Sequence, residues 1–252
     1  MLMPYFKKIL YKISFAIGQR LIAEKMIGIV ECENVEITMF GGNAAEQIYK
    51  KHSAPHRIFP FVGSKTLGVA LATVPGETDE IFKGKRFHEA RRKTNRARRE
   101  GFKCEKALSM KYLDDIYSIH ASTSIRQDRP VADNMLDVNE IRKFCEKNTL
   151  IHGVFDRNGK LKAYAAGVVC GEIFVLKRCI GHYESLKCGI MFLLVFELLV
   201  EMVRHRKLHG IPLWIQHDMF FARTAGARQF KKEAGFRPYR VKWLWSDQNL
   251  YR

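Results

Sequence analysis

Two short segments of the sequence carry side chains that can move protons near neutral pH. His182 lies in the run Gly-His-Tyr, and His217 lies in the run Gln-His-Asp, directly before Asp218. Histidine is the side chain whose ordinary pKa lies closest to neutrality, so each can act as a general base or acid. If residues 216–218 are extended, His217 and Asp218 point to opposite faces and do not form a dyad. An ordinary turn or strand-end role is the alternative for each segment.

A strongly basic run at residues 82–106 is a second candidate for binding chemistry. It holds 11 Lys or Arg residues against three acids. Small and apolar residues recur in it at helical spacing, which predicts a helix with a narrow buried stripe that ends at Gly101. The residues of this stripe are Phe87, Ala90, Thr94 and Ala97.

The remaining faces of this predicted helix are cationic. They suit phosphate groups of RNA, of a nucleotide cofactor or of a lipid surface, and a solvated basic face is the alternative. The residues that we expect to contact nucleic acid are Arg91, Arg92, Arg96, Arg98 and Arg99.

The composition of the chain agrees with binding to polyanions. The 252 residues carry a formal net charge of +17, and the isoelectric point is near 9.7. Such a charge predicts attraction to polyanions that weakens steeply with salt. The length allows one large domain or two small ones, and an apolar fraction of 47% is ordinary for a full core.

The six cysteines argue against a structural metal, because no pair has CxxC spacing and no histidine stands at zinc-site spacing from a pair. We expect reduced thiols in a cytoplasmic protein, with no metal and no tightly bound cofactor. Cys188 lies at a predicted loop-to-helix junction, where its pKa could be lowered.

Residues 1–26 read as an amphipathic helix whose apolar stretch is too short for a signal peptide or a membrane span. Packing on the rest of the protein and contact with a membrane surface are both open. The polar run VPGETDE at residues 74–80 is the best candidate boundary. We therefore expect a small α/β extension at residues 1–80 and a catalytic domain at residues 81–252.

The second half of the chain predicts a clear order of elements. Three strands at residues 150–156, 161–170 and 173–180 are separated by an Asn-Gly turn and a Gly-Glu turn, which indicates antiparallel neighbours. A long apolar helix over residues 190–207 follows. The remaining elements are a strand at 212–216, a helix at 222–234 and a strand at 236–245.

This order resembles that of the GNAT acyltransferase fold. A strand ends at Gly181, a short loop carries Gly189, and the long helix begins there. In GNAT proteins the backbone amides of this loop receive the pyrophosphate of the donor, for which a helix N-terminus is suited. Only one glycine of the family's signature fits here, and Glu184 would repel phosphate. The resemblance implies donor contacts by Leu186, Lys187, Cys188, Gly189 and Ile190.

Two further segments resemble the FemAB-like branch of this superfamily. The basic run at residues 83–102 resembles the segment that opens the FemAB catalytic module, and KKEAGFRPYRVKWLW at residues 231–245 resembles its close. FemAB-like proteins typically move an aminoacyl group from aminoacyl-tRNA to an amine, and relatives use acyl-CoA. The resemblance therefore implies tRNA and a small-molecule or peptide amine as partners.

The resemblance also implies roles for particular residues. Acyl transfer to an amine needs a base, a donor to the oxyanion and an acid for the leaving group. We expect the catalytic residues among His182, Tyr183, His217 and Asp218. The acceptor loop of the family corresponds to residues 125–134, where we expect substrate contacts by Arg126, Gln127 and Arg129.

The sequence thus predicts an α+β protein, with a GNAT-like mixed, mostly antiparallel sheet flanked by helices and an N-terminal α/β extension. The predicted activity is N-acyl transfer from aminoacyl-tRNA to an amine acceptor. Acyl-CoA as the donor is one alternative, and a non-catalytic nucleic-acid-binding module is another. A peripheral membrane enzyme that acts on lipid amines is a fourth possibility, based on the basic N-terminal helix.

Overall fold

The computed structural model describes residues 28, 31–56, 63–107, 109–126, 128–146, 151–221 and 224–247. The predicted N-terminal helix over residues 1–26 lies outside the described residues, as does Gln127.

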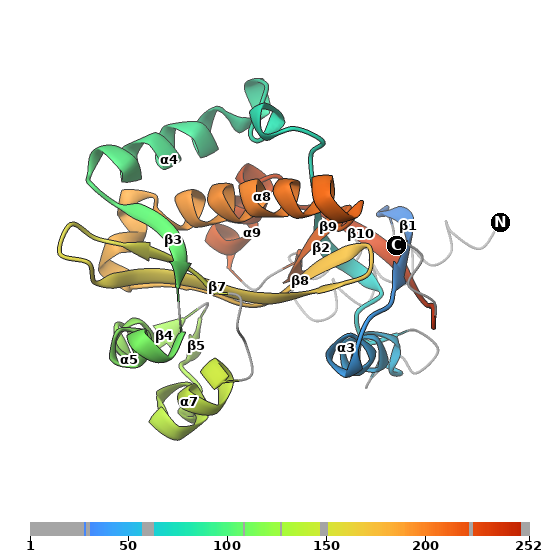
Figure 1. Cartoon of the computed structure of the whole chain (residues 1–252), viewed down its shortest axis with the longest axis horizontal. Helices are drawn as coiled ribbons and strands as arrows, with labels where there is room; N and C mark the ends of the chain where they lie inside the picture. Colours follow the sequence, from blue (N-terminus) through green and yellow to red (C-terminus); the bar gives the residue numbers. More distant parts are fainter. Residues whose placement is uncertain are drawn as a thin grey trace, which may run out of the picture.

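One large sheet forms the centre of the molecule (Figure 1). Its eight strands stand in the order β1-β10-β2-β9-β8-β7-β6-β3. In chain order the strands are β1 (Glu33–Met39), β2 (Leu67–Thr73), β3 (Lys103–Ala107), β6 (Ile151–Phe155), β7 (Leu161–Cys170), β8 (Ile173–Gly181), β9 (Trp214–Met219) and β10 (Arg237–Trp245).

Most neighbours in this sheet are antiparallel, and two pairs, β1 with β10 and β8 with β9, are parallel. The turn between β6 and β7 contains Gly159 with φ of +73°, and the turn between β7 and β8 contains Gly171 with φ of +61°. Glycine adopts these left-handed conformations without steric strain, so both tight turns form where the sequence predicts them. The predicted mixed, mostly antiparallel sheet is confirmed.

Helices cover both faces of the sheet (Figure 1). On one face lie α4 (His88–Arg99), α8 (Ile190–His209) and α9 (Ala225–Glu233), and on the other lie α3 (Asn43–Ser53), α5 (Leu113–Ala121) and α7 (Val138–Glu146). The short elements are α6 (Asp133–Leu136), the 3-10 turns η1 (Thr78–Glu80), η2 (Lys85–Phe87), η3 (Ser109–Tyr112) and η4 (Tyr183–Cys188), and a hairpin of β4 (Ile125–Arg126) with β5 (Arg129–Pro130).

The basic helix α4 forms as the sequence predicts. Phe87, Ala90, Thr94 and Ala97 are all buried. Gly101, with φ of +89°, ends the helix, and the amide of Phe102 donates back to the carbonyl of Ala97. The small side chains of this stripe let α4 pack closely on α8, where the main core lies.

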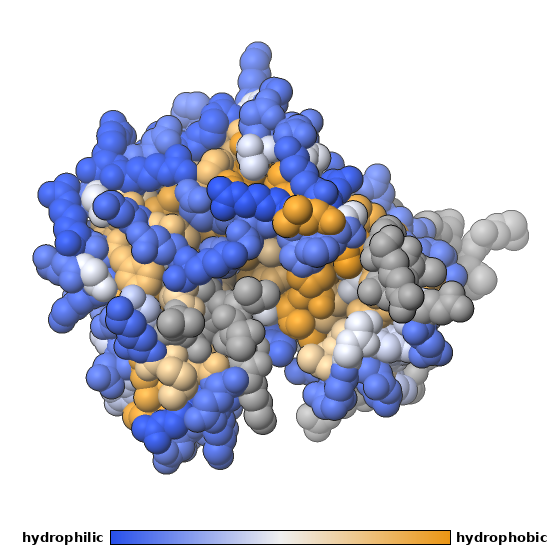
Figure 2. Space-filling model, viewed as in Figure 1, coloured by the Kyte–Doolittle hydropathy of each residue, from blue (hydrophilic) through white to orange (hydrophobic). Residues whose placement is uncertain are grey.

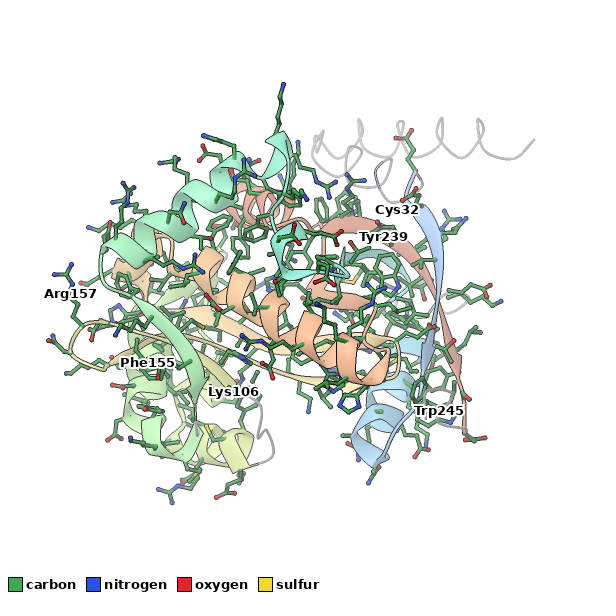
Figure 3. The ribbon with its side chains drawn as sticks, turned by 45° about the horizontal axis from the view of Figure 1, so that its top comes forward. Cys32, Lys106, Phe155, Arg157, Tyr239 and Trp245 are labelled. Atoms are coloured by element: carbon green, nitrogen blue, oxygen red, sulfur yellow. The ribbon has the colours of Figure 1, made fainter. Side chains whose placement is uncertain are left out.

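The N-terminal segment takes part in the main sheet. Strand β2 lies between β10 and β9, and β1 forms the edge beside β10. In Figure 3, Tyr239 and Trp245 of β10 lie at one end of the sheet, and Lys106 of β3 lies toward the other. The sheet therefore continues across the boundary expected near residue 80, and the division into two domains stays a prediction.

The helices of the described part of the chain are too short or too polar to cross a bilayer.

Candidate active site at the splayed strands

Strands β8 and β9 separate toward their carboxyl ends. Their parallel pairing runs from Ile173 opposite Trp214 to Val175 opposite Gln216. Beyond this point β8 continues to Gly181 and β9 continues to Met219 without pairing to each other. Two strands that diverge in this way leave backbone groups unpaired between them, and such groups need other partners.

A cavity of about 380 Å³ opens where the strands diverge. Its wall combines the carboxyl end of β8, His217 of β9, the β4 hairpin, the start of α8 and one face of α9. The lining residues are Thr123, Ile125, Arg126, Cys179, Ile180, Gly181, Tyr183, Leu186, Met191, Phe192, His217, Ala227, Phe230 and Lys231.

The charge of this cavity is one-sided. Two of its described lining residues, Arg126 and Lys231, are cations, and none of the described lining residues is Asp or Glu. Most of the remaining wall is apolar. A cavity of this kind favours a ligand that carries negative charge, or develops it during reaction, beside an apolar part.

Lys231 is the residue of this cavity that sequence reasoning missed. Its side chain is 5% exposed, and its ammonium group donates a hydrogen bond to the carbonyl of Met219. Burial lowers the pKa of Lys231, while the charge of Asp218 acts in the opposite direction. A signal was present, because Lys231 continues the helical stripe formed by Ala227 and Phe230 and so stands at a core-facing position.

His217 faces the same cavity and is held between aromatic rings. Its ring centroid lies 5.4 Å from that of Phe236 and 6.1 Å from that of Phe230. Burial, together with the charge of Lys231, lowers the pKa of His217 to about 4. Its Nδ1 is buried and has no hydrogen-bond partner within the described part of the chain. The imidazole is therefore neutral at pH 7 and can accept a proton.

Asp218 points away from His217 toward the N-terminal segment. Its carboxylate forms an ion pair with Lys65, and its backbone has a φ of +52°, which is unusual for a residue other than glycine. Burial would raise the pKa of Asp218, but the hydrogen bond and charge of Lys65 outweigh it and lower the pKa. The two side chains do not form a dyad, because the carboxylate of Asp218 pairs with Lys65 and not with the imidazole.

The two residues predicted at the end of β8 lie in different surroundings. Tyr183 lines the cavity and is 58% exposed, so its phenol stands at the mouth. His182 is not among the residues that line the cavity. Burial and the charge of Lys162 lower the pKa of His182. A catalytic role for His182 stays a prediction.

Arg126 is fixed at the edge of the cavity by hydrogen bonds to neutral groups. One guanidinium nitrogen donates to the carbonyl of Gly181 at 3.1 Å, and another donates to the hydroxyl of Ser122 at 3.0 Å. Its Nε is buried and has no partner among the described residues. Burial lowers the pKa of Arg126. Arg129, on β5, is exposed, and it does not line the cavity.

The loop expected to hold a donor pyrophosphate packs tightly against α4. Gly189 has a φ of +87°, and a Cβ placed on it would lie 2.3 Å from the carbonyl oxygen of Lys93. The negative end of a carbonyl dipole therefore lies beside the start of α8. The donor contacts predicted for Leu186, Lys187, Cys188, Gly189 and Ile190 stay predictions, and of these residues Leu186 lines the cavity.

The suggestion that Cys188 has a lowered pKa is wrong. Burial raises the pKa of the Cys188 thiol, and the carboxylate of Glu100 on the neighbouring turn raises it further. A negative charge beside a thiol disfavours the thiolate.

The solvent-facing side of α4 carries a shallow basic groove of about 600 Å³. Figure 2 shows hydrophilic side chains along the edge of the molecule that α4 forms in Figure 1. Of the five arginines predicted to contact nucleic acid, Arg96 alone does not line this groove, and it pairs with Glu100 at 2.7 Å. The groove is lined by His88, Arg91, Arg92, Asn95, Arg98 and Arg99.

Some of these arginines also have partners inside the molecule. Arg91 donates to the carbonyls of Phe82 and Gly84, and Arg98 pairs with Glu197 on α8 at 2.8 Å. Arg92 pairs with Glu89 at 2.7 Å. Exposed ion pairs of this kind are weak, so these guanidinium groups can exchange partners with a phosphate.

Groups of three or more His, Cys, Asp or Glu that could hold a metal ion do not occur among the described residues.

No protein-family model and no curated protein matches this chain. Solved structures resemble it in fold. The match with FemX covers 68% of this chain and 59% of the FemX chain, with a TM-score of 0.50 and 11% identity. The match with L-PGS from Bacillus licheniformis covers 68% of this chain and 57% of the L-PGS chain, with a TM-score of 0.48 and 16% identity. The match with a tandem GNAT protein from the clavulanic acid biosynthesis pathway covers 68% of this chain and 50% of that protein's chain, with a TM-score of 0.46 and 11% identity.

At these identities the resemblance concerns the fold alone. The described chain has a mostly antiparallel sheet flanked by helices, a fold similar to that of FemX. The match extends over less than two thirds of the length of each of these structures.

Proposed function

We propose that this protein is an N-acyltransferase that moves an aminoacyl group from aminoacyl-tRNA to an amine acceptor. The observation that carries the proposal is the cavity between β8 and β9, where two cations and a neutral histidine face an acid-free, largely apolar space. Such a cavity suits a reaction in which a carbonyl oxygen gains negative charge.

The cavity residues supply the parts that the reaction needs. The nitrogen of the acceptor amine forms a bond to the ester carbonyl carbon, and negative charge develops on the carbonyl oxygen. The ammonium group of Lys231 stabilises this oxyanion, and burial strengthens the interaction because water is excluded. Neutral His217 accepts the proton that the amine loses and passes it to the ribose oxygen of the tRNA as the ester C–O bond breaks.

The acceptor is held at the opposite edge of the cavity. Arg126 has a buried Nε without a partner among the described residues, while its other nitrogens are fixed by Ser122 and Gly181. A guanidinium positioned in this way suits a carboxylate or phosphate on the acceptor. Exposed Tyr183 at the mouth is placed to contact the acceptor as it enters.

Two features support tRNA over coenzyme A as the donor. The basic face of α4 can receive phosphates of a nucleic acid, whose binding to arginine is strong and salt-dependent. At the start of α8, the carbonyl of Lys93 lies where a pyrophosphate would approach the amide groups next to Gly189.

The test follows transfer of label into an amide. A mixed tRNA pool charged with ¹⁴C-labelled amino acids is incubated with the protein and a mixture of small amines and peptides. Label that survives mild base reports the amide product, because the ester of aminoacyl-tRNA is hydrolysed. Lys231→Met is expected to lower the rate roughly 100-fold or more, as loss of an oxyanion-stabilising group does. The control Lys143→Met removes an exposed lysine from α7 and is expected to stay within about twofold of wild type.

Two outcomes would oppose the proposal. Base-stable label that comes from ¹⁴C-acetyl-CoA and not from charged tRNA would show that coenzyme A is the donor. Equal rates for Lys231→Met and Lys143→Met would remove Lys231 from the chemistry.

A further inference from the structure

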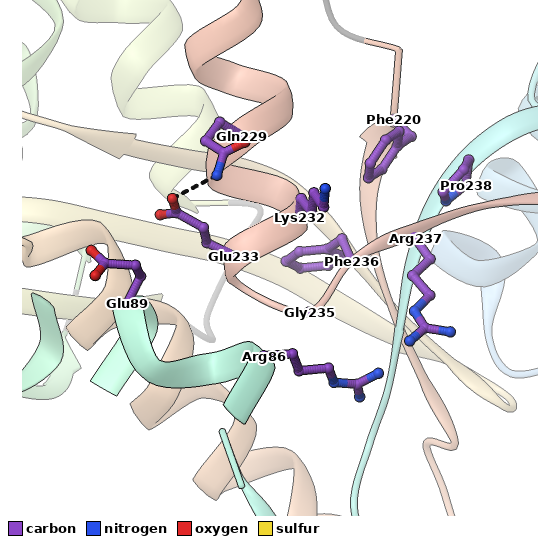
Figure 4. A pocket seen from close by; sticks show the side chains of 10 residues that line it. All are labelled: Arg86, Glu89, Phe220, Gln229, Lys232, Glu233, Gly235, Phe236, Arg237 and Pro238. Carbon is purple, nitrogen blue, oxygen red and sulfur yellow. Dashed lines mark hydrogen bonds between the residues drawn. The ribbon is translucent and has the colours of Figure 1, made fainter. Parts of the chain in front are cut away.

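A second groove, of about 610 Å³, lies beside the first turn of α4 and outside the proposed active site (Figure 4). It is bounded by α4, by one face of α9 and by the start of β10. Its lining residues are Arg86, Glu89, Phe220, Gln229, Lys232, Glu233, Gly235, Phe236, Arg237 and Pro238.

The floor of this groove is apolar and partly aromatic. The floor is formed by Phe220, Phe236 and Pro238. In Figure 4 both phenyl rings lie between α9 and the start of β10. Phe236 is 2% exposed and is fixed in the core, while Phe220 is partly buried. The accessible part of Phe220 therefore provides the ring surface on which a planar group can stack.

The positive charges of the groove are available for a ligand, whereas its negative charges are engaged. Glu89 pairs with Arg92 at 2.7 Å, and Glu233 pairs with Lys93 at 2.7 Å. Within the described part of the chain, Arg86, Lys232 and Arg237 form no ion pair.

Two of these cations come from different elements and act on the same phenol. In Figure 4 the guanidinium groups of Arg86, before α4, and Arg237, on β10, extend toward the same side of the groove. The charges of both act on the phenol of Tyr239, where each opposes the rise in pKa caused by burial. Two guanidinium groups that converge beside an apolar floor suit a phosphate attached to a planar base.

The position of the groove connects it with both other surfaces. Glu89 of α4 borders it next to Arg86 of η2, and α4 also carries the basic groove lined by His88 and Arg92. On α9, Lys232 faces this groove while neighbouring Lys231 faces the cavity. One helix, about 10 Å across, therefore separates the groove from the proposed active site.

We propose that this groove binds unpaired nucleotides at the 3′ end of an RNA whose helical part lies on the basic face of α4. The inference rests on the proposed function, because it places the strand that carries the aminoacyl ester beside the cavity. A base stacks on Phe220, and Arg86 and Arg237 bind the adjacent phosphates.

The experiment measures fluorescence anisotropy of the full-length protein with two RNA probes. One is a fluorescein-labelled single-stranded RNA of six nucleotides that ends in CCA, and the other is a blunt RNA duplex. The double variant Arg86→Ala/Arg237→Ala is expected to weaken binding of the single strand at least tenfold and that of the duplex by less than threefold. The slope of log affinity against log salt for the single strand is expected to fall by about 0.7 for each phosphate that the variant no longer binds.

Two matched controls separate stacking from general electrostatics. Phe220→Leu keeps the floor apolar and is expected to weaken the single strand about fivefold, in line with the weakening of one stacking interaction. It is expected to leave binding of an abasic strand with the same phosphates unchanged. Arg142→Ala removes an exposed charge from α7 and is expected to change the affinity for each probe less than twofold. Thermal melting of each variant verifies that the fold is kept.

The inference is overturned if the double variant weakens the single strand no more than Arg142→Ala does. In that case transfer from charged tRNA by the same double variant at the wild-type rate would leave the proposed function intact. If the wild-type protein binds neither RNA and binds acetyl-CoA, the proposed donor and this inference both fail.

Discussion

Buried ionisable side chains define the chemistry of this protein at the scale of single residues. Lys231 and His217 face the cavity, and burial lowers the pKa of each. His120, on the other face of the sheet, is fully buried and hydrogen-bonded to the hydroxyl of Tyr164 at 2.6 Å and to the carbonyl of Met135 at 2.5 Å. Burial lowers the pKa of His120 to about 4. These groups tie the stability of the fold to pH.

Acid is expected to destabilise the protein through His120 before any carboxylate titrates. The pKa of His120 is about 4 in the folded state and 6.5 as its ordinary value. Because the unfolded chain binds the proton more readily, the free energy of unfolding falls as pH drops below 6.5 and stops falling near pH 4. His120→Gln, which can still hydrogen-bond, is expected to remove about 2 kcal/mol of the decrease between pH 7 and pH 5.

Urea unfolding at the two pH values measures this difference. His88→Gln, which removes a histidine that is 72% exposed, serves as the control and is expected to keep the wild-type pH dependence. If His120→Gln keeps the wild-type pH dependence as well, burial does not lower the pKa of His120.

At the scale of elements, the contact between α4 and the start of α8 is the tightest feature of the donor side. Gly189 provides the positive φ that starts α8, and its missing side chain lets the backbone of Lys93 approach. The less exposed ion pair of Lys93 with Glu233 joins α4 to α9, and the buried stripe of α4 packs in the same core as α8. The basic face and the cavity are therefore held in a fixed relation.

Gly189→Ala is expected to loosen this contact. Gly84, with φ of +92° and open space around it, provides a matched control for the backbone effect alone. Gly84→Ala is expected to cost about 1 kcal/mol of stability, whereas Gly189→Ala adds a collision with the backbone of Lys93 and is expected to cost about 2 to 4 kcal/mol. Chemical denaturation measures both values. Equal losses for the two variants would show that α4 moves aside at no energetic cost.

At the scale of the whole molecule, the N-terminal segment closes the sheet. Strand β2 lies between β10 and β9, and its residues Val69, Ala70 and Leu71 are completely buried. Lys65, just before β2, also fixes Asp218 beside the cavity. Strands β9 and β10 have no direct pairing, so both depend on β2.

A fragment of residues 81–252 is therefore expected not to fold by itself. Removal of β2 would expose two strand edges and the apolar surface that β2 covers. Circular dichroism during heating is expected to show no cooperative transition for the fragment. A cooperative transition near that of the full chain would show instead that residues 81–252 form an independent domain, as the sequence suggested.

The sequence predicted best those features that depend on neighbours along the chain. The stripe of Phe87, Ala90, Thr94 and Ala97 and the glycine-containing turns of β6–β7 and β7–β8 follow from local periodicity and backbone preference. The hairpin of β4 and β5 was not predicted, because two residues per strand leave no readable alternation. Lys231 was missed because its basic neighbours conceal a core-facing position.

By itself, the sequence determined the order of the elements, the basic helix and the mostly antiparallel sheet, since hydrophobic period and turn residues act locally. The tertiary structure alone decided that β2 lies between β9 and β10, and that His217 and Lys231 share a cavity while Asp218 turns to Lys65. Those relations join residues far apart in the chain. These relations depend on packing, on the splay of β8 from β9 and on the burial of charge. None of these three factors leaves a local pattern in the sequence.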